Sequence, residues 1–143
     1  MSGYDILFGE NELVARWVSA QIKDAPPLDD AVAFGAVRDG MLIGGLAFTE
    51  YRGTDVRVTV AGYGNWMTRR LLRVGCSYAF LDLGCRRMTA MIKRTNKQSR
   101  TLCEKIGFRL EGVHPQTYED GGTACSYGMT RQNCRWIKET DRG

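Results

Sequence analysis

Hydrophobic positions along the chain follow two different periods, and the changes from one period to the other divide it into strands and helices. Alternating or short apolar runs typical of strands occur at residues 4–8, 31–37, 41–49, 56–60, 87–93, 108–117 and 123–129. Apolar positions repeat every three or four residues, as on one helix face, at 11–23, 67–81 and 97–106. This order predicts an α/β protein with a mixed sheet and helices packed on its faces.

Glycine, proline and asparagine residues mark where these elements should end and begin. Pro26 follows the first helix and cannot continue its hydrogen bonds. Asp39-Gly40 is a strong hairpin signal between two strands. Asn65 and Asn96 are suited to cap the second and third helices, and Gly107 is suited to a left-handed helix end. On the second helix we expect the core face to contain Met67, Leu71, Val74, Tyr78 and Leu81.

The composition is that of one ordinary globular domain. The 143 residues are 43% hydrophobic and 25% charged, and no apolar run approaches the roughly 18 residues of a membrane span. The first residues lack the basic and apolar blocks of a secretory signal. Five scattered cysteines, without a C-x-x-C pair and with His114 as the only histidine, argue against a zinc site. We therefore expect no metal, reduced thiols and a cytoplasmic location.

The net charge of +4 is unevenly distributed. Between Trp66 and Arg109 there are eleven Lys and Arg residues against Asp82 and Glu104, so this stretch carries +9 and the remainder −5. Such a basic half favours a polyanionic partner, either a phosphate-bearing cofactor or nucleic acid. A solvated basic face without a partner is the simpler alternative.

One stretch near the end of the chain has a more specific pattern. It reads N-x-x-S-x-x-L-x-E-K-x-G-F-x-x-E-G, filled by Asn96, Ser99, Leu102, Glu104, Lys105, Gly107, Phe108, Glu111 and Gly112. Together with the order of elements, this pattern resembles the GCN5-related N-acetyltransferase (GNAT) superfamily. The similarity is greatest to the branch that acetylates ribosomal-protein amino termini. It runs from about Tyr78 to Trp136, whereas the first half agrees in element order more than in residues.

The resemblance implies a single N-acetyltransferase-like domain over residues 1–143, with a C-terminal tail, about 137–143, that lacks fixed structure. The sheet should be mostly antiparallel and twisted, with a central splayed parallel pair formed by Val56–Val60 and Arg87–Lys93. Acetyl-coenzyme A, the implied co-substrate, would lie between these strands and bond to their unpaired backbone groups. Its pyrophosphate would lie at the start of the helix after the first strand. A monomer or a homodimer is expected, with no membrane partner.

The chain departs from the family where the pyrophosphate is expected. The usual Q/R-x-x-G-x-G/A turn is replaced by Gly62-Tyr63-Gly64-Asn65-Trp66-Met67-Thr68-Arg69. We expect backbone N–H groups there, with charge from Arg69 or Arg70, to replace the missing glycines; alternatively, the glycines only let the chain turn. The residues expected at the cofactor are Val60, Gly62, Tyr63, Gly64, Asn65, Trp66, Met67, Thr68, Arg69, Arg70, Asn96, Ser99 and Cys103.

Three residues are candidates for catalysis. Glu50, at the end of the third strand, could take the proton of the attacking amine, although an ordinary surface carboxylate is the simpler interpretation. Cys103 stands where many family members have a proton-donating tyrosine, and it could equally be a small core residue. Tyr118 is a lesser candidate, as are Tyr51 and Asp55.

Three functions remain open from the sequence. The first is acetyl transfer from acetyl-coenzyme A to a primary amine, in a protein N-terminus or a small molecule. The second is a nucleic-acid-directed enzyme of the same fold, whose basic residues bind phosphates. The third is a cofactor-free binding module that has kept the fold. The resemblance favours the first, and the fold alone does not decide among them.

Overall fold

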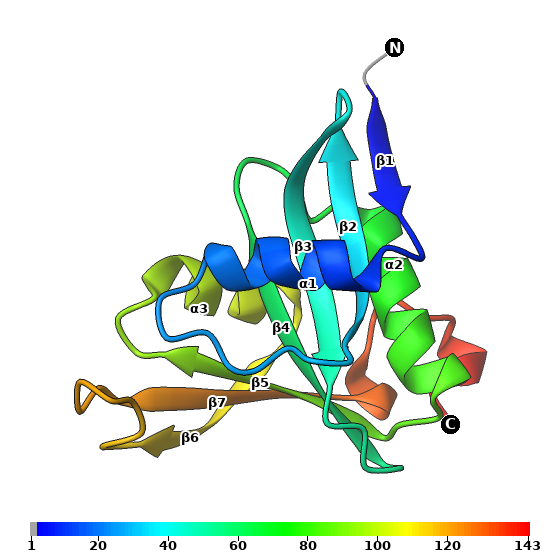
Figure 1. The fold of residues 1–143 in the computed structure, drawn as a ribbon. Helices are drawn as coiled ribbons and strands as arrows, with labels where there is room; N and C mark the ends of the chain where they lie inside the picture. The colour runs from blue at the N-terminus through cyan, green and yellow to red at the C-terminus, as the bar shows by residue number, and fades with distance from the viewer. Residues whose placement is uncertain (1–2) are drawn as a thin grey trace.

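A twisted sheet is the frame of the molecule (Figure 1), which a computed structural model describes for residues 3–143. Within these residues seven strands pair in the order β1-β2-β3-β4-β5-β7-β6, and only β4 and β5 run parallel. The strands are β1 (Tyr4–Leu7), β2 (Val32–Arg38), β3 (Met41–Thr49), β4 (Asp55–Gly62), β5 (Arg87–Lys93), β6 (Arg109–His114) and β7 (Ala124–Thr130). The predicted mixed, mostly antiparallel sheet with one parallel pair is therefore confirmed.

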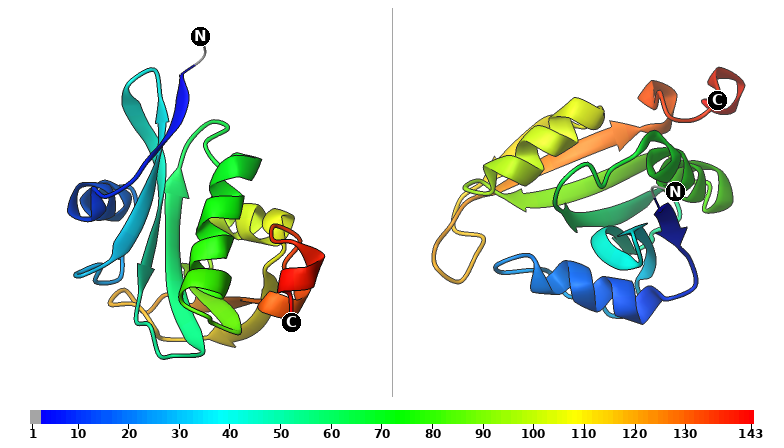
Figure 2. Two further views of the ribbon diagram at one scale, coloured as in Figure 1. Left: turned by 90° about the vertical axis from the view of Figure 1, so that its right-hand side faces the viewer. Right: turned by 90° about the horizontal axis from the view of Figure 1, so that it is seen from above.

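The helices cover both faces of this sheet. Helix α1 (Asn11–Ala20) lies on one face, and α2 (Arg69–Ser77) and α3 (Lys97–Ile106) lie on the other (Figure 2). Short turns of other helix types occupy Tyr78–Asp82, Arg131–Asn133 and Glu139–Asp141. The order of elements agrees with that expected from the sequence, although α1 ends three residues before the predicted Lys23.

Side-chain size differs between the two faces. Under α1, Val14 and Val18 pack against a cluster that includes Ala33, Ala47 and Ala61. A Cβ on Gly45 would lie 2.7 Å from a methyl carbon of Val18, so α1 depends on small strand residues for its close approach. The opposite face carries the larger core, built on aliphatic and aromatic residues of the central strands and of α2 and α3.

Helix α2 begins later than the sequence pattern suggested. Its cap is Thr68, whose side-chain oxygen accepts from Leu71 N at 3.1 Å, and not Asn65. The chain then passes into a π-helical turn at Tyr78. A π turn contains more residues than an α turn and so shifts the buried face, which leaves Leu81, expected in the core, 39% exposed. The residues that α2 and the π turn bury are Leu71, Leu72, Gly75, Cys76, Ala79 and Phe80.

Both ends of α3 agree with the sequence. Asn96 Oδ1 accepts from Ser99 N at 3.2 Å, as an N-cap does. Gly107 ends the helix with φ of 115°, a conformation that favours glycine. The expected inward face divides in two, because Cys103 and Ile106 are buried in the core whereas Ser99 and Leu102 are half-buried.

The C-terminal tail, which we expected to lack fixed structure, packs against the rest of the domain. Ile137 is buried against the main core, and Arg131 Nε donates to the carbonyl oxygen of Asp141 at 2.7 Å. The indole N–H of Trp136 also donates to the carbonyl of Ile106 at the end of α3. Burial of apolar area and these hydrogen bonds offset the entropy lost when the tail is ordered.

The connection from β4 to α2 is anchored by an indole ring. Trp66, 4% exposed, lies over Gly44 and Gly62, which face each other in the β3·β4 pair. A Cβ on Gly44 would lie 2.2 Å from the ring, and one on Gly62 would lie 2.5 Å from it. The two glycines therefore form a platform that only a residue without a side chain provides.

This platform predicts that added methyl groups will be destabilising. Gly44→Ala or Gly62→Ala should lower the free energy of unfolding by about 1–3 kcal/mol, because the ring must move out of its packed position. Gly3→Ala is the matched control, since its nearest neighbour would be at an ordinary 3.5 Å. Chemical denaturation measures all three, and Gly44→Ala should cost less when Trp66 is already Ala. Equal losses in the two backgrounds would contradict this packing.

Candidate functional site

The parallel strands β4 and β5 pair only at one end. Their register covers Asp55↔Arg87, Val56↔Met88 and Arg57↔Thr89, after which the strands separate. Figure 1 shows them diverging. Beyond this point β4 continues to bond with β3, and β5 with β7. The inner edges, from Val58 and Ala90 onward, thus carry backbone N–H and C=O groups that need another partner.

A cavity of about 540 Å³ fills the gap between the separated strands. Its walls come from five segments: β4, β5, the start of α3, the α1–β2 connection and the β6–β7 connection. Residues 58–60 and 90–93 line it from the two strands, and Tyr118 lines it from the β6–β7 connection. The cavity therefore brings together parts of the chain that are far apart in sequence.

A second cavity, of about 320 Å³, adjoins the first. It lies between the connection that follows β4, at Gly62, Tyr63 and Gly64, and the first turns of α3. The two cavities share four lining residues, Gln21, Ile22, Asn96 and Ser99. A long, narrow ligand could thus extend from the gap between the strands to the connection after β4.

Asn96 stands at the junction of the two cavities. Its backbone N–H donates to the carbonyl of Lys93, and its side chain caps α3, so both its backbone and its side chain are fixed. The side-chain amide also provides N–H donors that a cap does not use. Asn96 is therefore a well-positioned polar contact for a ligand.

A hydrogen-bonded group holds α3 against the sheet behind this site. Tyr127 of β7 is fully buried; its hydroxyl donates to Glu104 Oε2 at 2.8 Å and accepts from Arg100 Nε at 3.0 Å. Arg100 also donates to the carbonyl of Arg94 at 3.0 Å. Burial is the largest cause that raises the pKa of Tyr127, so its phenol keeps the proton that it donates.

The outer side of the first cavity is crossed by an ion-paired lysine. Lys93 Nζ lies 2.7 Å from Asp24 Oδ2 and 2.6 Å from Asp120 Oδ2. It also lies 5.2 Å from the centroid of the Tyr118 ring. Hydrogen bonds to Asp120 and then to Asp24 raise the pKa of Lys93. Burial, the largest cause, raises the pKa of Tyr118, which therefore stays a neutral phenol at neutral pH.

The structure brings together part of the residue set expected at the cofactor. The expected residues that line one or both cavities are Val60, Gly62, Tyr63, Gly64, Trp66, Asn96 and Ser99. Asn65, Met67, Thr68, Arg69 and Arg70 are not among the lining residues. Thr68 and Arg70 instead face β1 across a separate cavity of about 140 Å³. Trp66 lines both that cavity and the 320 Å³ one, so its ring stands between the site and the start of α2.

Two of the three catalytic candidates lie elsewhere. Glu50 follows β3 and is within 3.6 Å of Arg52 and 3.3 Å of Arg57, at the end where β4 and β5 still pair. Cys103 is 1% exposed in the core, where burial raises the pKa of its thiol to about 12. Tyr118 is the candidate that lines the cavity.

Sequence reasoning missed most of the outer wall. Lys93 was expected only as the last residue of a strand, and Asp24 and Asp120 were not singled out. They lie 69 and 27 positions from Lys93, so no local pattern connects them. These contacts form only because two loops fold over the same strand end, and the sequence contains no local pattern that indicates this.

The basic stretch does not form one free surface. Arg87 pairs with Glu111, Lys93 pairs with two aspartates and Arg100 is hydrogen-bonded to Tyr127. Arg69, Arg70 and Arg73 are exposed on α2, whereas Arg94 and Lys97 are exposed near the start of α3. Some of the basic residues therefore form contacts within the protein and are not free to bind a partner.

Three general features complete the description of residues 3–143. All five cysteines are free and buried. Within the described chain no group of three or more His, Cys, Asp or Glu side chains is arranged to hold a metal ion. None of the helices described there has the length and apolar character needed to span a bilayer.

Comparison with known proteins gives structural matches only. No family model and no curated protein matches the sequence. Among solved structures, the spermidine/spermine N-acetyltransferase SpeG of Vibrio cholerae is 13% identical with a TM-score of 0.69, covering 90% of this chain and 93% of that one. The IAA acetyltransferase of Bacillus cereus is 13% identical with a TM-score of 0.72, covering 90% and 99%.

A GNAT-family acetyltransferase of Streptococcus pneumoniae gives a similar match, at 18% identity and a TM-score of 0.69 over 90% of this chain and 99% of that one. These likenesses confirm the resemblance seen in the sequence at the level of the fold, and they leave the ribosomal-protein branch a prediction. The chain therefore has the GNAT fold, with its parallel strands splayed around the candidate site.

Proposed function

We propose that the protein is an N-acetyltransferase that moves an acetyl group from acetyl-coenzyme A to a primary amine. The observation that carries this proposal is the gap between β4 and β5, with its free backbone edges and its two adjoining cavities. The fold of known acetyltransferases supports it. A small-molecule amine is the acceptor we favour, because SpeG is named for spermidine and spermine; a protein N-terminus stays the alternative.

The residues at the gap fit the co-substrate well along its pantetheine arm. Peptide-like amides in that arm can pair with the free edges of β4 and β5, and the Asn96 and Ser99 side chains can add polar contacts. The phosphate end should lie along Gly62–Gly64 and the start of α3, because the start of α2 lies beyond Trp66. When bound, acetyl-coenzyme A supplies an activated thioester.

The chain itself must orient the amine and manage protons. Tyr118, a neutral phenol in the cavity wall, is the group we assign as proton donor to the leaving thiolate. Glu50 and Cys103 have no part in this proposal, because the first is paired outside the cavities and the second is in the core. We assign removal of the amine proton to solvent at the outer opening.

Two experiments distinguish this proposal from the other two hypotheses. Native mass spectrometry of the purified protein with added acetyl-coenzyme A should give a one-to-one complex. A cofactor-free binding module would give none. Affinity for duplex DNA that falls steeply with salt would instead favour the nucleic-acid-directed enzyme. A cytoplasmic location stays a prediction.

The two capped helices allow a matched test of the cofactor site. Asn96→Ala and Thr68→Ala should each cost about 1 kcal/mol of stability, because each removes an N-cap. Only Asn96→Ala should also weaken acetyl-coenzyme A binding, by about ten-fold, since Asn96 lines both cavities and Thr68 lines neither of them. Calorimetric titration measures the affinity and thermal unfolding the stability. Equal affinity in the two variants would mean that Asn96 is only a cap.

Tyr118→Phe should lower kcat by about ten-fold or more, because general acid catalysis is typically worth at least that factor. The raised pKa keeps the wild-type donor protonated up to alkaline pH, so its rate should fall only above the ordinary tyrosine value of about 10. This alkaline limb should be missing in Tyr118→Phe. Glu50→Gln and Cys103→Ala should stay within about three-fold of the parent. A larger loss in Glu50→Gln would return that residue to the mechanism.

A further inference from the structure

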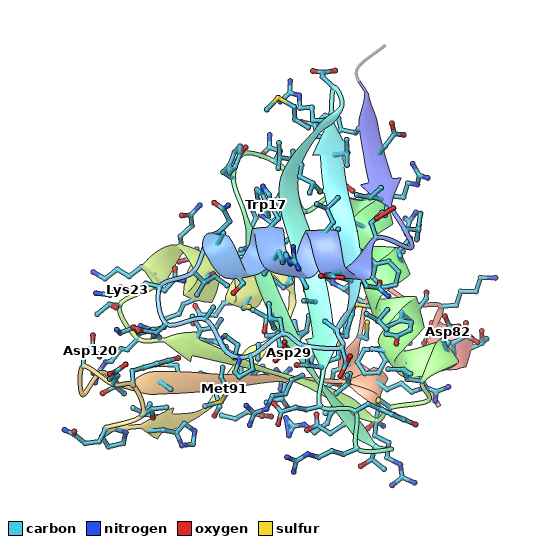
Figure 3. All side chains as sticks on the ribbon, viewed as in Figure 1. Trp17, Lys23, Asp29, Asp82, Met91 and Asp120 are labelled. Carbon is cyan, nitrogen blue, oxygen red and sulfur yellow. The ribbon has the colours of Figure 1, made fainter. Side chains whose placement is uncertain are left out.

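One lysine joins three segments across the outer side of the cavity. Asp24 belongs to the α1–β2 connection, Lys93 ends β5, and Tyr118 and Asp120 belong to the β6–β7 connection. We call these four residues the clasp. Figure 3 places Asp120 at the β6–β7 turn and Lys23, the neighbour of Asp24, at the same end of the molecule. All four clasp residues line the 540 Å³ cavity.

The clasp is tightly built rather than a chance surface pair. The Lys93 side chain is only 13% exposed. A Cβ on Gly122 would lie 2.8 Å from Lys93 Cε, so the turn backbone packs directly on the lysine stem. Asp120 Oδ1 accepts from Gly122 N at 2.8 Å while its other oxygen faces Lys93. This turn thus holds one carboxylate in place toward the ammonium.

The charges of the clasp determine what could replace the lysine. Two carboxylates share the single ammonium of Lys93, and the nearby charge of Lys23 also acts on Asp120. Moving Lys93 away would leave both carboxylates unpaired in a partly covered site, which is costly. A neutral or anionic molecule would not compensate this loss, whereas a second cation would.

We propose that Asp24 and Asp120 form a cation subsite of the acceptor, that Lys93 occupies this subsite in the free protein, and that the acceptor is an amine with a second positive charge. The proposal rests on the acetyltransferase function proposed above. One amine of the acceptor reaches the gap between β4 and β5 while its second ammonium takes the place of Lys93 Nζ. Lys93 thereby determines specificity, since it competes with every acceptor and yields only to a cation.

This arrangement gives the charged residues opposite effects on acceptor binding. Lys93→Met keeps the length of the side chain and removes the internal competitor, so cationic acceptors should bind more tightly. Asp24→Asn and Asp120→Asn remove the attraction, so the same acceptors should bind more weakly. Lys105→Met is the control, because Lys105 is an exposed lysine of α3 that lines neither cavity.

The test uses three probes of similar length on the full chain: putrescine, which has two amines, butylamine, which has one, and γ-aminobutyrate, which carries a carboxylate. Calorimetric titration without co-substrate measures binding directly. In Lys93→Met the Kd of putrescine should fall about ten-fold, and in Asp120→Asn it should rise about ten-fold. Lys105→Met should stay within about two-fold of the parent. With acetyl-coenzyme A present, the single amine of butylamine or γ-aminobutyrate must lie at the thioester, so the KM of neither should respond to these variants. Thermal unfolding verifies that each variant is folded.

With acetyl-coenzyme A present, the same pattern should appear in the KM of putrescine, with the KM of acetyl-coenzyme A unchanged. Putrescine binding that is equal in Lys93→Met, Asp120→Asn and the parent, or absent from all of them, would overturn the cation subsite. A KM for butylamine that responds to these variants as strongly as the KM of putrescine would overturn the requirement for a second charge. Failure of the protein to bind acetyl-coenzyme A, with the putrescine pattern intact, would overturn the proposed function and leave the cation subsite standing.

Discussion

The separation of β4 from β5 is the constraint on which the rest of the structure depends. Strands that run parallel for three residue pairs and then diverge leave a row of backbone donors and acceptors without a partner in the sheet. Such groups are costly to bury unless something bonds to them. The surrounding elements do not close the gap; they line it, and the gap becomes the two adjoining cavities of the candidate site.

Two sets of contacts keep the gap open. On one side, the fully buried Tyr127 of β7 is hydrogen-bonded to Arg100 and Glu104 of α3, and these bonds hold α3 against the sheet. On the other side, Trp66 lies on the Gly44–Gly62 platform and fixes the connection that leaves β4. Both anchors lie beside the gap and not in it, so they hold its walls without filling its centre.

The connection after β4 also shows how one large residue can redirect a site. An indole that occupies the space over two glycines separates the gap from the start of α2 and its arginines. The start of α3, capped by Asn96, is instead the helix N-terminus that lines both cavities. The basic residues between Trp66 and Arg109 are divided among internal pairs and two separate helices. The net charge of this stretch therefore says little about a partner.

The sequence by itself determined the order of the elements, the bounds of β5 and α3, the Asn96 cap and the Gly107 end, because these depend on apolar period and local backbone preference. The family resemblance also led us to expect Asn96, Ser99 and Gly62–Gly64 near a cofactor, and these residues line the two cavities. Only the tertiary structure decided that α2 is capped by Thr68 and not by Asn65, that Cys103 and Glu50 lie outside the cavities, and that Asp24 and Asp120 meet Lys93. The physical reason is that these outcomes depend on how separate segments pack: the fit of one indole on two glycines, and the folding of two loops over one strand end.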